Sequence, residues 1–272
     1  QKGKCFWMRV YEIPEGSKNS KGRAIQNLIN IEQDDRVKAF ICTQDLKDED
    51  YVNSNYVIMA TKMGQVKKTS LEQYSRPRSN GINAITIKDG DELLEAKLTN
   101  GNSQIMLAVQ SGKAIRFEES KTRPMGRNAS GVRGIRLKDK KDEVVGMISV
   151  NDMDANILVV SENGFGKRSS LEDYRLTNRG GKGVKTISIT EKTGKLVSLK
   201  SVSDNDDLMI INKSGIAIRM QVEDLRVMGR ATQGVKVISL KDGDSIAAVA
   251  KVMKDEDDIE DVNEIEFTGD TV

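Results

Sequence analysis

The sequence contains no histidine, only two cysteines and few aromatic residues, and each shortage excludes a class of protein. Without histidine the chain has no imidazole for acid–base catalysis or for the metal sites that usually depend on it. Cys5 and Cys42 are too few for a disulfide framework in 272 residues, and they fit a reducing cytoplasm. Because aromatic residues make up only 4% of the chain, a buried core must consist mainly of Val, Ile, Leu, Ala and Met.

Long apolar runs are also missing. No stretch approaches the roughly 18 consecutive apolar residues of a membrane-spanning helix. The chain opens with Gln1 and enters a short apolar run at once, without the pattern of a secretory signal peptide. We therefore expect a cytoplasmic protein that does not associate with a membrane.

What the sequence does contain is a repeat of about 50 residues. A glycine closes an apolar run and precedes a segment rich in Lys and Arg at Gly3, Gly64, Gly112, Gly164 and Gly215. A second glycine follows each of these after 17 or 19 residues, at Gly22, Gly81, Gly131, Gly183 and Gly234. Three intervals between first glycines measure 48 to 52 residues, and the first interval is 61 because of a polar insertion at residues 45–55. This repeat length with strand-like units is typical of a radial β architecture.

Each repeat is predicted to form four short strands, with turns marked by sequences such as Ser-Asn-Gly and Lys-Asp-Gly-Asp. The first repeat lacks a strand before Gly3, so we expect that strand to precede Gln1 in a longer protein. The expected strands are 56–61, 65–71, 83–88 and 93–98 in the second repeat, 104–109, 114–117, 134–137 and 144–149 in the third, 157–161, 166–170, 185–189 and 196–200 in the fourth, and 208–212, 217–221, 236–240 and 246–252 in the fifth.

The charges divide the chain into a basic body and an acidic tail. Residues 253–272 hold nine Asp or Glu against one Lys, a net charge of −8, so residues 1–252 carry about +10. We expect one all-β domain at residues 1–252, with repeats at about 1–44, 56–99, 104–150, 156–200 and 207–252, followed by a disordered tail. The tail either competes with a polyanion for the basic surface or only keeps the protein soluble.

Basic residues recur on the second strand of each repeat and in the loop that follows it. Since a radial fold places equivalent positions around one rim, they predict a curved belt of positive charge suited to the phosphates of bent duplex DNA. The alternative is that Lys and Arg on exposed strand edges only prevent edge-to-edge aggregation. The candidate DNA-binding residues are Lys18, Lys21, Arg23, Lys67, Lys68, Arg76, Arg78, Arg116, Arg123, Arg127, Arg133, Lys167, Arg168, Arg179, Gly180, Gly181, Lys182, Gly183, Lys185, Arg219, Arg230 and Lys236.

Four segments closely resemble the C-terminal domain of the A subunit of bacterial DNA gyrase. They are KGRAIQNLINIEQDDRV at 21–37, MGRNASGVRGIRL at 125–137, NGFGKRSSLEDY at 163–174 and MGRATQGVKVI at 228–238. The resemblance implies a six-bladed, β-propeller-like disc, or β-pinwheel, of four-stranded blades that exchange strands, with the first blade missing or incomplete here. It also implies non-sequence-specific binding and wrapping of duplex DNA around the basic rim.

The same resemblance implies a role within a larger enzyme. The domain would support ATP-dependent negative supercoiling by a type II DNA topoisomerase, together with the N-terminal breakage–reunion domain of the gyrase A subunit and with the gyrase B subunit. ATP and Mg²⁺ would be used by other parts of that enzyme, so no cofactor and no catalytic residue is expected here. The isolated domain is expected to be a monomer.

The family has a glycine-rich box that reads Gln-Arg-Arg-Gly-Gly-(Lys/Arg)-Gly. The closest stretch here is Thr-Asn-Arg-Gly-Gly-Lys-Gly at residues 177–183, which agrees with the box in its last five positions. We interpret it as a box-like loop, with Arg179 and Lys182 supplying charge and the glycines allowing close approach to a phosphate. The alternative is a glycine-rich loop with no special role. The true box is expected upstream of Gln1.

Two other functions stay open at this point. One is the C-terminal domain of the A subunit of topoisomerase IV, which shares the fold but lacks the box. The other is a protein-binding propeller of the WD-repeat kind, which is expected to carry Trp-Asp or Gly-His signatures in each blade. The sequence has a single tryptophan, Trp7, and no histidine, which disfavours the WD-repeat interpretation.

Overall fold

The computed structural model describes residues 1–17, 20–241 and 243–253. Two expectations lie outside these ranges. One is a DNA contact by Lys18, and the other is the disorder of the acidic tail, of which only Met253 is described.

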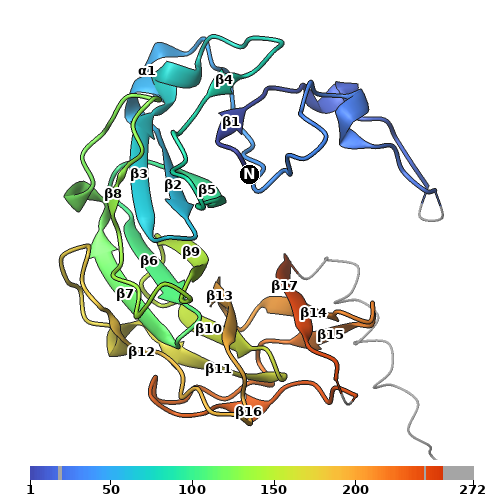
Figure 1. Cartoon of the computed structure of the whole chain (residues 1–272), viewed down its shortest axis with the longest axis vertical. Helices are drawn as coiled ribbons and strands as arrows, with labels where there is room; N and C mark the ends of the chain where they lie inside the picture. Colours follow the sequence, from blue (N-terminus) through green and yellow to red (C-terminus); the bar gives the residue numbers. More distant parts are fainter. Residues whose placement is uncertain (18–19, 242, 254–272) are drawn as a thin grey trace, which may run out of the picture. The chain divides into compact units, whose positions relative to one another are not determined.

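Short antiparallel strands build the described part of the chain (Figure 1). Its one α-helix is α1 (Glu49–Ser54), which lies in the polar insertion, and within the described ranges no helix has the length and hydrophobicity needed to cross a membrane. Single 3₁₀ turns are η1 (Val10–Glu12), η2 (Ile25–Asn27), η3 (Leu71–Tyr74), η4 (Glu119–Lys121) and η5 (Leu171–Asp173). The expected all-β class is confirmed. The strands are β1 (Lys4–Cys5), β2 (Tyr56–Thr61), β3 (Gln65–Ser70), β4 (Ile82–Asn83), β5 (Leu93–Thr99), β6 (Gln104–Val109), β7 (Lys113–Glu118), β8 (Val132–Arg133), β9 (Val144–Val150), β10 (Asn156–Ser161), β11 (Phe165–Ser170), β12 (Val184–Lys185), β13 (Leu196–Val202), β14 (Asp206–Asn212), β15 (Ala217–Gln221), β16 (Val235–Lys236) and β17 (Ile246–Met253).

Neighbouring repeats exchange strands, as the family resemblance implied. Each four-stranded sheet takes three strands from one repeat and its outermost strand from the next repeat. The sheet orders are β5-β2-β3-β8, β12-β7-β6-β9 and β13-β10-β11-β16, besides the smaller sheets β15-β14-β17 and β1-β4. In the exchanged pairs Gln65 lies opposite Arg133, and Phe165 lies opposite Lys236.

The third strands of the second to fifth repeats are much shorter than expected, and in the third repeat the strand ends before the expected range begins. Where the sequence predicted strands at 83–88, 134–137, 185–189 and 236–240, the structure has the two-residue strands β4, β8, β12 and β16. After two paired residues, two successive amides turn toward one carbonyl. The N–H groups of Ala84 and Ile85 both donate to the carbonyl of Gly3, at 2.8 and 3.2 Å. Successive amides of a strand point in opposite directions, so this geometry ends the strand.

The same double hydrogen bond recurs in the later repeats. The carbonyl of Gly64 accepts from Gly134 and Ile135, and the carbonyl of Gly164 accepts from Val237 and Ile238. These first glycines have positive φ, and a Cβ on Gly64 would lie 2.9 Å from the carbonyl oxygen of Ile135. Only glycine fits this position, which explains why the glycine recurs with the repeat.

The described residues form two compact units. The first comprises Gln1–Val109, Ala114–Asn151 and Leu176–Val184, and the second comprises Gln110–Lys113, Asp152–Arg175 and the chain from Lys185 onward. Central strands supply the cores: Ile58, Ile105 and Leu107 are fully buried in the first unit. Leu158 and Ile210 are fully buried in the second. Burial of each such side chain stabilises the fold by about 1.5–3 kcal/mol.

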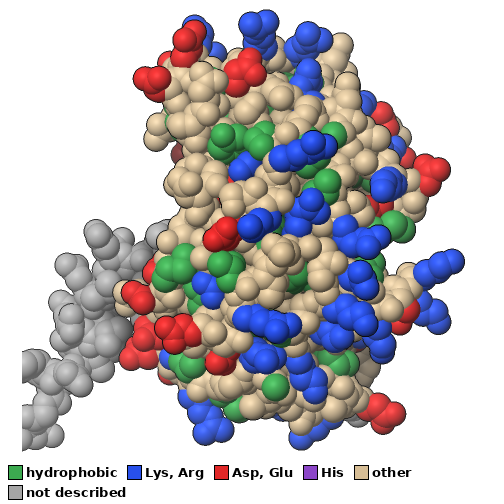
Figure 2. All heavy atoms as spheres, turned by 90° about the vertical axis from the view of Figure 1, so that its left-hand side faces the viewer, with side chains coloured by type: hydrophobic (Ala, Val, Ile, Leu, Met, Phe, Trp, Pro, Cys, Tyr) green, Lys and Arg blue, Asp and Glu red, His purple; other side chains and the backbone are tan. Residues whose placement is uncertain are grey.

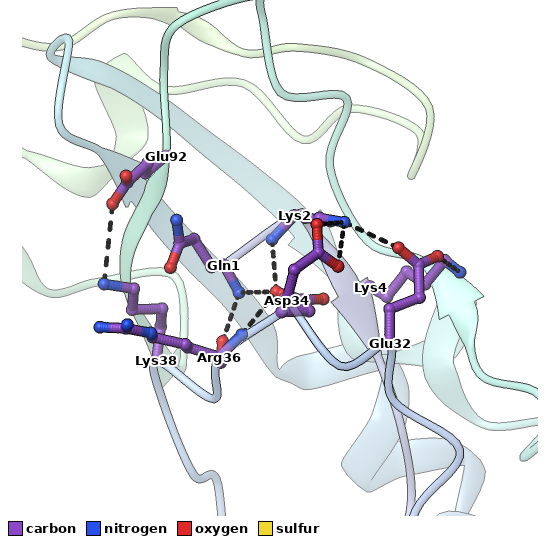
Figure 3. Close-up of polar contacts among 9 residues, drawn as sticks. Gln1, Lys2, Lys4, Glu32, Asp34, Arg36, Lys38 and Glu92 are labelled. Carbon is purple, nitrogen blue, oxygen red and sulfur yellow. Dashed lines mark hydrogen bonds and ion pairs between the residues drawn. The ribbon is translucent and has the colours of Figure 1, made fainter. Parts of the chain in front are cut away.

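Polar contacts tie the N-terminal residues to residues 32–36 (Figure 3). The amine of Lys2 lies 2.8 Å from Glu32 and 2.7 Å from Asp34, and Lys4 lies 3.1 Å from Glu32. These hydrogen bonds raise the pKa of Lys2, and those from Lys2 and Lys4 lower the pKa of Glu32. Between these contacts, residues 6–17 lead away from the sheets of the first unit and residues 20–31 lead back (Figure 1).

Candidate nucleic-acid interface

The loop between the second and third strands of each repeat carries most of the exposed candidates. Figure 2 shows many Lys and Arg side chains at the surface, with Asp and Glu side chains among them. The exposed candidates are Lys21, Arg23, Arg76, Arg78, Arg123, Arg133, Lys182, Lys185, Arg219 and Lys236. Arg136 is exposed as well, but it was not among the candidates because the sequence placed it inside the expected third strand at 134–137 and not in the loop.

Three arginines in successive repeats hold the third strand of the repeat before them. Nη1 of Arg127 donates to the carbonyl oxygen of Asn83 at 3.5 Å. Nη1 of Arg179 donates to that of Arg133 at 3.1 Å, and Nη1 of Arg230 to that of Lys185 at 2.8 Å. All three side chains are half-buried. A guanidinium has five N–H donors, so a bond that fixes its position leaves donors for an anion.

Two of these arginines thereby lie next to a second cation. Arg179 rests on the backbone of Arg133, and Arg230 rests on the backbone of Lys185, and the side chains of Arg133 and Lys185 are exposed. Each pair combines cations from two consecutive repeats. Such a pair suits a phosphate, because charge-assisted hydrogen bonds from two groups can converge on its oxygens. In the third case the residue whose carbonyl Arg127 contacts is Asn83, which carries no charge.

The backbone fixes these loops in the same register each time. The amides of Met125, Thr177 and Met228 donate to the carbonyls of Lys68, Arg116 and Arg168, at 2.8, 2.9 and 2.8 Å. Parallel bridges join the same stretches of chain. Each arginine-bearing loop therefore lies along the second strand of the preceding repeat, in equivalent positions.

This placement corrects the expectation for four candidates on the second strands. Lys67 and Lys167 are fully buried, and Lys68 and Arg168 are only 4% and 6% exposed. Their strands, QVKKTS and FGKRSS, carry polar residues on both faces, as exposed strands do, but the loop of the next repeat covers them. They stabilise the fold, and none of the four reaches the surface that a phosphate would contact.

The buried cations have internal partners. The amine of Lys68 lies 3.2 Å from the carboxylate of the fully buried Glu119 and 4.4 Å from the ring centre of Tyr56. Arg168 binds the carboxylate of Asp204 and the carbonyl of Leu225.

Two further second-strand candidates pair with the adjacent first strand. Nε of Arg116 donates to Oε1 of Gln104 at 2.6 Å, and Nε of Arg219 donates to Oδ2 of Asp207 at 2.7 Å. Partial burial lowers the pKa of Arg116. Both side chains remain partly accessible, but a cross-strand partner engages each of them.

The glycines of the box-like loop serve the fold more than an anion. Gly180 has a φ of +82°, and its amide donates to the carbonyl of Gly134 at 2.6 Å. The carbonyl of Gly181 accepts from Arg136, and a Cβ on Gly183 would lie 2.4 Å from the carbonyl oxygen of Ala114. The loop is thus docked on the preceding repeat through Gly180 and Gly183. This corrects the expectation that these two glycines let the backbone approach a phosphate, and leaves Arg179 and Lys182 to supply the charge.

Within the part of the chain that the structure describes, no three His, Cys, Asp or Glu side chains gather closely enough to hold a metal ion.

Comparisons with known proteins identify the family. A family model described as DNA gyrase C-terminal domain, beta-propeller, matches residues 1–44, 55–100, 104–151, 155–203 and 206–253. The DNA gyrase A subunit of Staphylococcus aureus (strain NCTC 8325) is 43% identical over 273 residues, which cover 100% of this chain and 30% of that protein. The chain thus spans under a third of the length of the curated relatives it matches.

Two solved structures have the same fold. The C-terminal domain of DNA topoisomerase IV superposes with a TM-score of 0.84 at 24% identity, covering 98% of this chain and 82% of that one. The DNA gyrase A C-terminal domain superposes with a TM-score of 0.78 at 25% identity, covering 93% and 80%. From the family model, the relatives and the exchanged four-stranded sheets together, this chain belongs to the DNA gyrase C-terminal domain family, with its propeller-like fold.

Proposed function

We propose that this chain binds duplex DNA without sequence specificity and wraps it, as the C-terminal domain of a DNA gyrase A subunit. The observation that carries the proposal is the threefold recurrence of one arrangement. Arg127, Arg179 and Arg230 each come from the loop of one repeat and are fixed on the backbone of the repeat before it. A spacing set by the repeat suits a ligand whose own charges recur regularly, as the phosphates of a duplex do.

The chemistry of these positions favours the phosphate backbone over base edges. The exposed side chains are Lys and Arg, and the loops around them are rich in Gly, Ser, Thr and Asn, whose amides and hydroxyls suit phosphate oxygens. Bending a duplex of 20–30 base pairs by 40–90° costs of order 1–6 kcal/mol. Several phosphate contacts are needed to offset that cost, and cations repeated along the chain supply them.

Within the full-length protein, this domain supports ATP-dependent negative supercoiling by a type II topoisomerase that acts in the cytoplasm. Its partners in that enzyme are the breakage–reunion domain of the gyrase A subunit and the gyrase B subunit, which use Mg²⁺ and ATP. The gyrase A subunits of Staphylococcus epidermidis and Staphylococcus aureus, at 43% identity, support gyrase over topoisomerase IV. The likeness to topoisomerase IV, at 24% identity, supports the fold alone.

The test measures both the affinity for duplex DNA and the change in DNA topology on binding. Binding to a linear duplex is measured from about 50 to 200 mM salt, and the same protein is incubated with relaxed circles that are then treated with a relaxing topoisomerase. Wrapping predicts a steep loss of affinity with salt and positive writhe trapped in the circles. Salt-dependent binding without trapped writhe would limit the proposal to DNA binding, and binding that does not respond to salt would contradict it.

A further inference from the structure

Two fully buried lysines lie directly beneath the arginine-bearing loops. Lys67 and Lys167 occupy equivalent places, each three residues after the first glycine of its repeat, and both are 0% exposed. The amine of Lys67 donates to the carbonyl oxygens of Ala84 and Arg127, at 2.6 and 2.5 Å. The amine of Lys167 donates to the carbonyl oxygen of Gly229 at 2.6 Å and to Oγ1 of Thr232 at 3.2 Å.

Each lysine contacts the loop backbone at a loop arginine or at the residue before it. One partner of Lys67 is the carbonyl of Arg127, and one partner of Lys167 is the carbonyl of Gly229, the residue before Arg230. Each lysine belongs to one repeat, and the loop that it holds belongs to the next. Burial of an ammonium group is costly unless hydrogen bonds compensate, so both the lysine and the loop are fixed by the same contacts.

The loop without such a lysine is held in another way. Ile115 takes the equivalent place beneath the box-like loop at residues 177–183, which has the same length as the loops at 125–131 and 228–234. There the backbone of Gly180 and Gly181 bonds to Gly134 and Arg136. Lysine therefore accompanies the two Met-Gly-Arg loops, and isoleucine accompanies the glycine-rich loop.

We propose that Lys67 and Lys167 are positioning residues for DNA binding, which hold Arg127 and Arg230 in the orientation that meets the phosphates. The proposal rests on the proposed function. Each amine fixes the backbone from which the arginine side chain extends, and Nη1 of that arginine then reaches the carbonyl of Asn83 or Lys185. A pre-oriented guanidinium loses less conformational freedom on binding than a mobile one.

The test replaces each lysine by the residue that the third repeat has at the same place. Lys67→Ile and Lys167→Ile are each expected to lower duplex affinity by about threefold to tenfold. In an Arg127→Gln background, Lys67→Ile is expected to have no further effect, because the lysine acts only through that arginine. The matched control is Ile115→Met, which alters the same place in the third repeat and is expected to leave the affinity unchanged.

Equal losses in both backgrounds would indicate a direct phosphate contact and overturn the proposal, as would unchanged affinity in folded variants. If the isoleucine variants do not fold, Thr232→Val removes one partner of Lys167 from the loop side. It is expected to lower the affinity by about twofold when Arg230 is present and not in an Arg230→Gln background, and no loss would contradict the proposal.

A measurement without DNA separates this inference from the proposed function. Hydrogen exchange at the amides of residues 125–131 is expected to quicken in Lys67→Ile and to stay the same in Ile115→Met. Unchanged exchange in Lys67→Ile would overturn the positioning role, whatever the DNA result. Absence of salt-dependent binding by the wild type would instead contradict the proposed function.

Discussion

Nη1 of Arg179 donates to the backbone carbonyl of Arg133 at 3.1 Å, while Nε of the same side chain donates to the carbonyl of Lys121 at 2.8 Å. Two directional bonds thus fix a loop arginine of the fourth repeat on the third repeat. Arg133 itself carries an exposed guanidinium, so the contact brings a cation of one repeat onto the backbone of a residue that carries a second cation.

We expect Arg179→Lys to weaken duplex binding about threefold to tenfold although the charge is kept. A lysine has a single amine and cannot reproduce the forked pair of bonds that holds the guanidinium. Arg175→Lys, at a nearby exposed arginine, is the control and is expected to bind as the wild type does. Equal losses in both variants, or none in Arg179→Lys, would show that the fixed geometry of Arg179 has no role.

Replacing an exposed cation and replacing a cation that has a cross-strand partner are expected to change the salt dependence of DNA binding differently. Lys185 is exposed beside Arg230, so Lys185→Gln should reduce the slope of log affinity against log salt by about 1. Arg116 is engaged by Gln104, so Arg116→Gln should leave that slope unchanged. Titrations of both variants against one duplex decide this, and a smaller slope for Arg116→Gln alone would reverse the assignment.

Removal of the carboxylate of Glu119 is expected to destabilise the fold by about 3–5 kcal/mol, because it leaves the buried amine of Lys68 without its ion-pair partner. Glu119 also accepts hydrogen bonds from Thr99 and Ser103. Urea unfolding of Glu119→Ala measures the loss. Glu118→Ala, one residue away and exposed, should change the free energy of unfolding by less than about 0.5 kcal/mol. Similar values for the two variants would contradict a stabilising role for the pair.

Stability is expected to depend on pH through the two buried lysines. Burial lowers the pKa of Lys67 and of Lys167 from 10.5 to about 8. Between pH 8 and 10.5 the unfolded chain therefore binds more protons than the folded chain, and the free energy of unfolding rises with pH. The stability gained above this window is lost as pH falls through the folded-state pKa of about 8.

Other charged groups lie near the two amines, and groups that titrate at higher pH limit the pH range in which the effect of the lysines can be measured. Arg127 lowers the pKa of Lys67, while Asp173 raises and Arg230 lowers that of Lys167. Burial raises the pKa of Cys5 to about 11, and it also raises the pKa of Tyr74, so these groups titrate at higher pH. Unfolding at about pH 7.5 and about pH 9 compares the wild type with the Lys67→Ile, Lys167→Ile double variant. We expect a rise with pH in the wild type that is smaller in the double variant, and equal changes would exclude the lysines as its source.

Gly183→Ala is expected to unfold the box-like loop or the sheet that it joins. Its φ is +69°, and the added Cβ would lie 2.4 Å from the carbonyl oxygen of Ala114, so strain and a backbone clash coincide. Gly126→Ala is the matched control, since no atom lies within 4 Å of its Cβ position and its φ is ordinary. Thermal melting should show a large loss for Gly183→Ala and little change for Gly126→Ala. The opposite order would contradict the docking of the loop through Gly183.

The sequence could predict the first, second and fourth strands, because their apolar runs and the recurrent glycines are local signals. It could not predict the length of the third strands, since what ends them is the carbonyl of a glycine in the preceding repeat, such as Gly3 for Ala84 and Ile85. The partner of an exchanged strand belongs to the neighbouring repeat, beyond the reach of any local pattern.

The candidate site divides in the same way. Loop cations such as Arg179 and Lys185 could be found from the sequence because loops lie at the surface. Lys67 could not be told apart from an exposed lysine, since its strand, QVKKTS, carries polar residues on both faces. What buries it is the loop of the following repeat, which carries Arg127.

Because each four-stranded sheet takes its outer strand from the next repeat, the shared sheet links neighbouring repeats. A single proteolytic cut in a connecting loop would leave both fragments held by a strand that one lends to the other, so nicked protein should stay assembled until it is denatured. After loss or gain of one whole repeat, each glycine hairpin would still pair with an equivalent outer strand from the next repeat. Every remaining sheet would therefore keep its exchanged strand. The number of repeats can therefore change during evolution in whole steps, while a deletion that ends inside a repeat breaks two sheets at once.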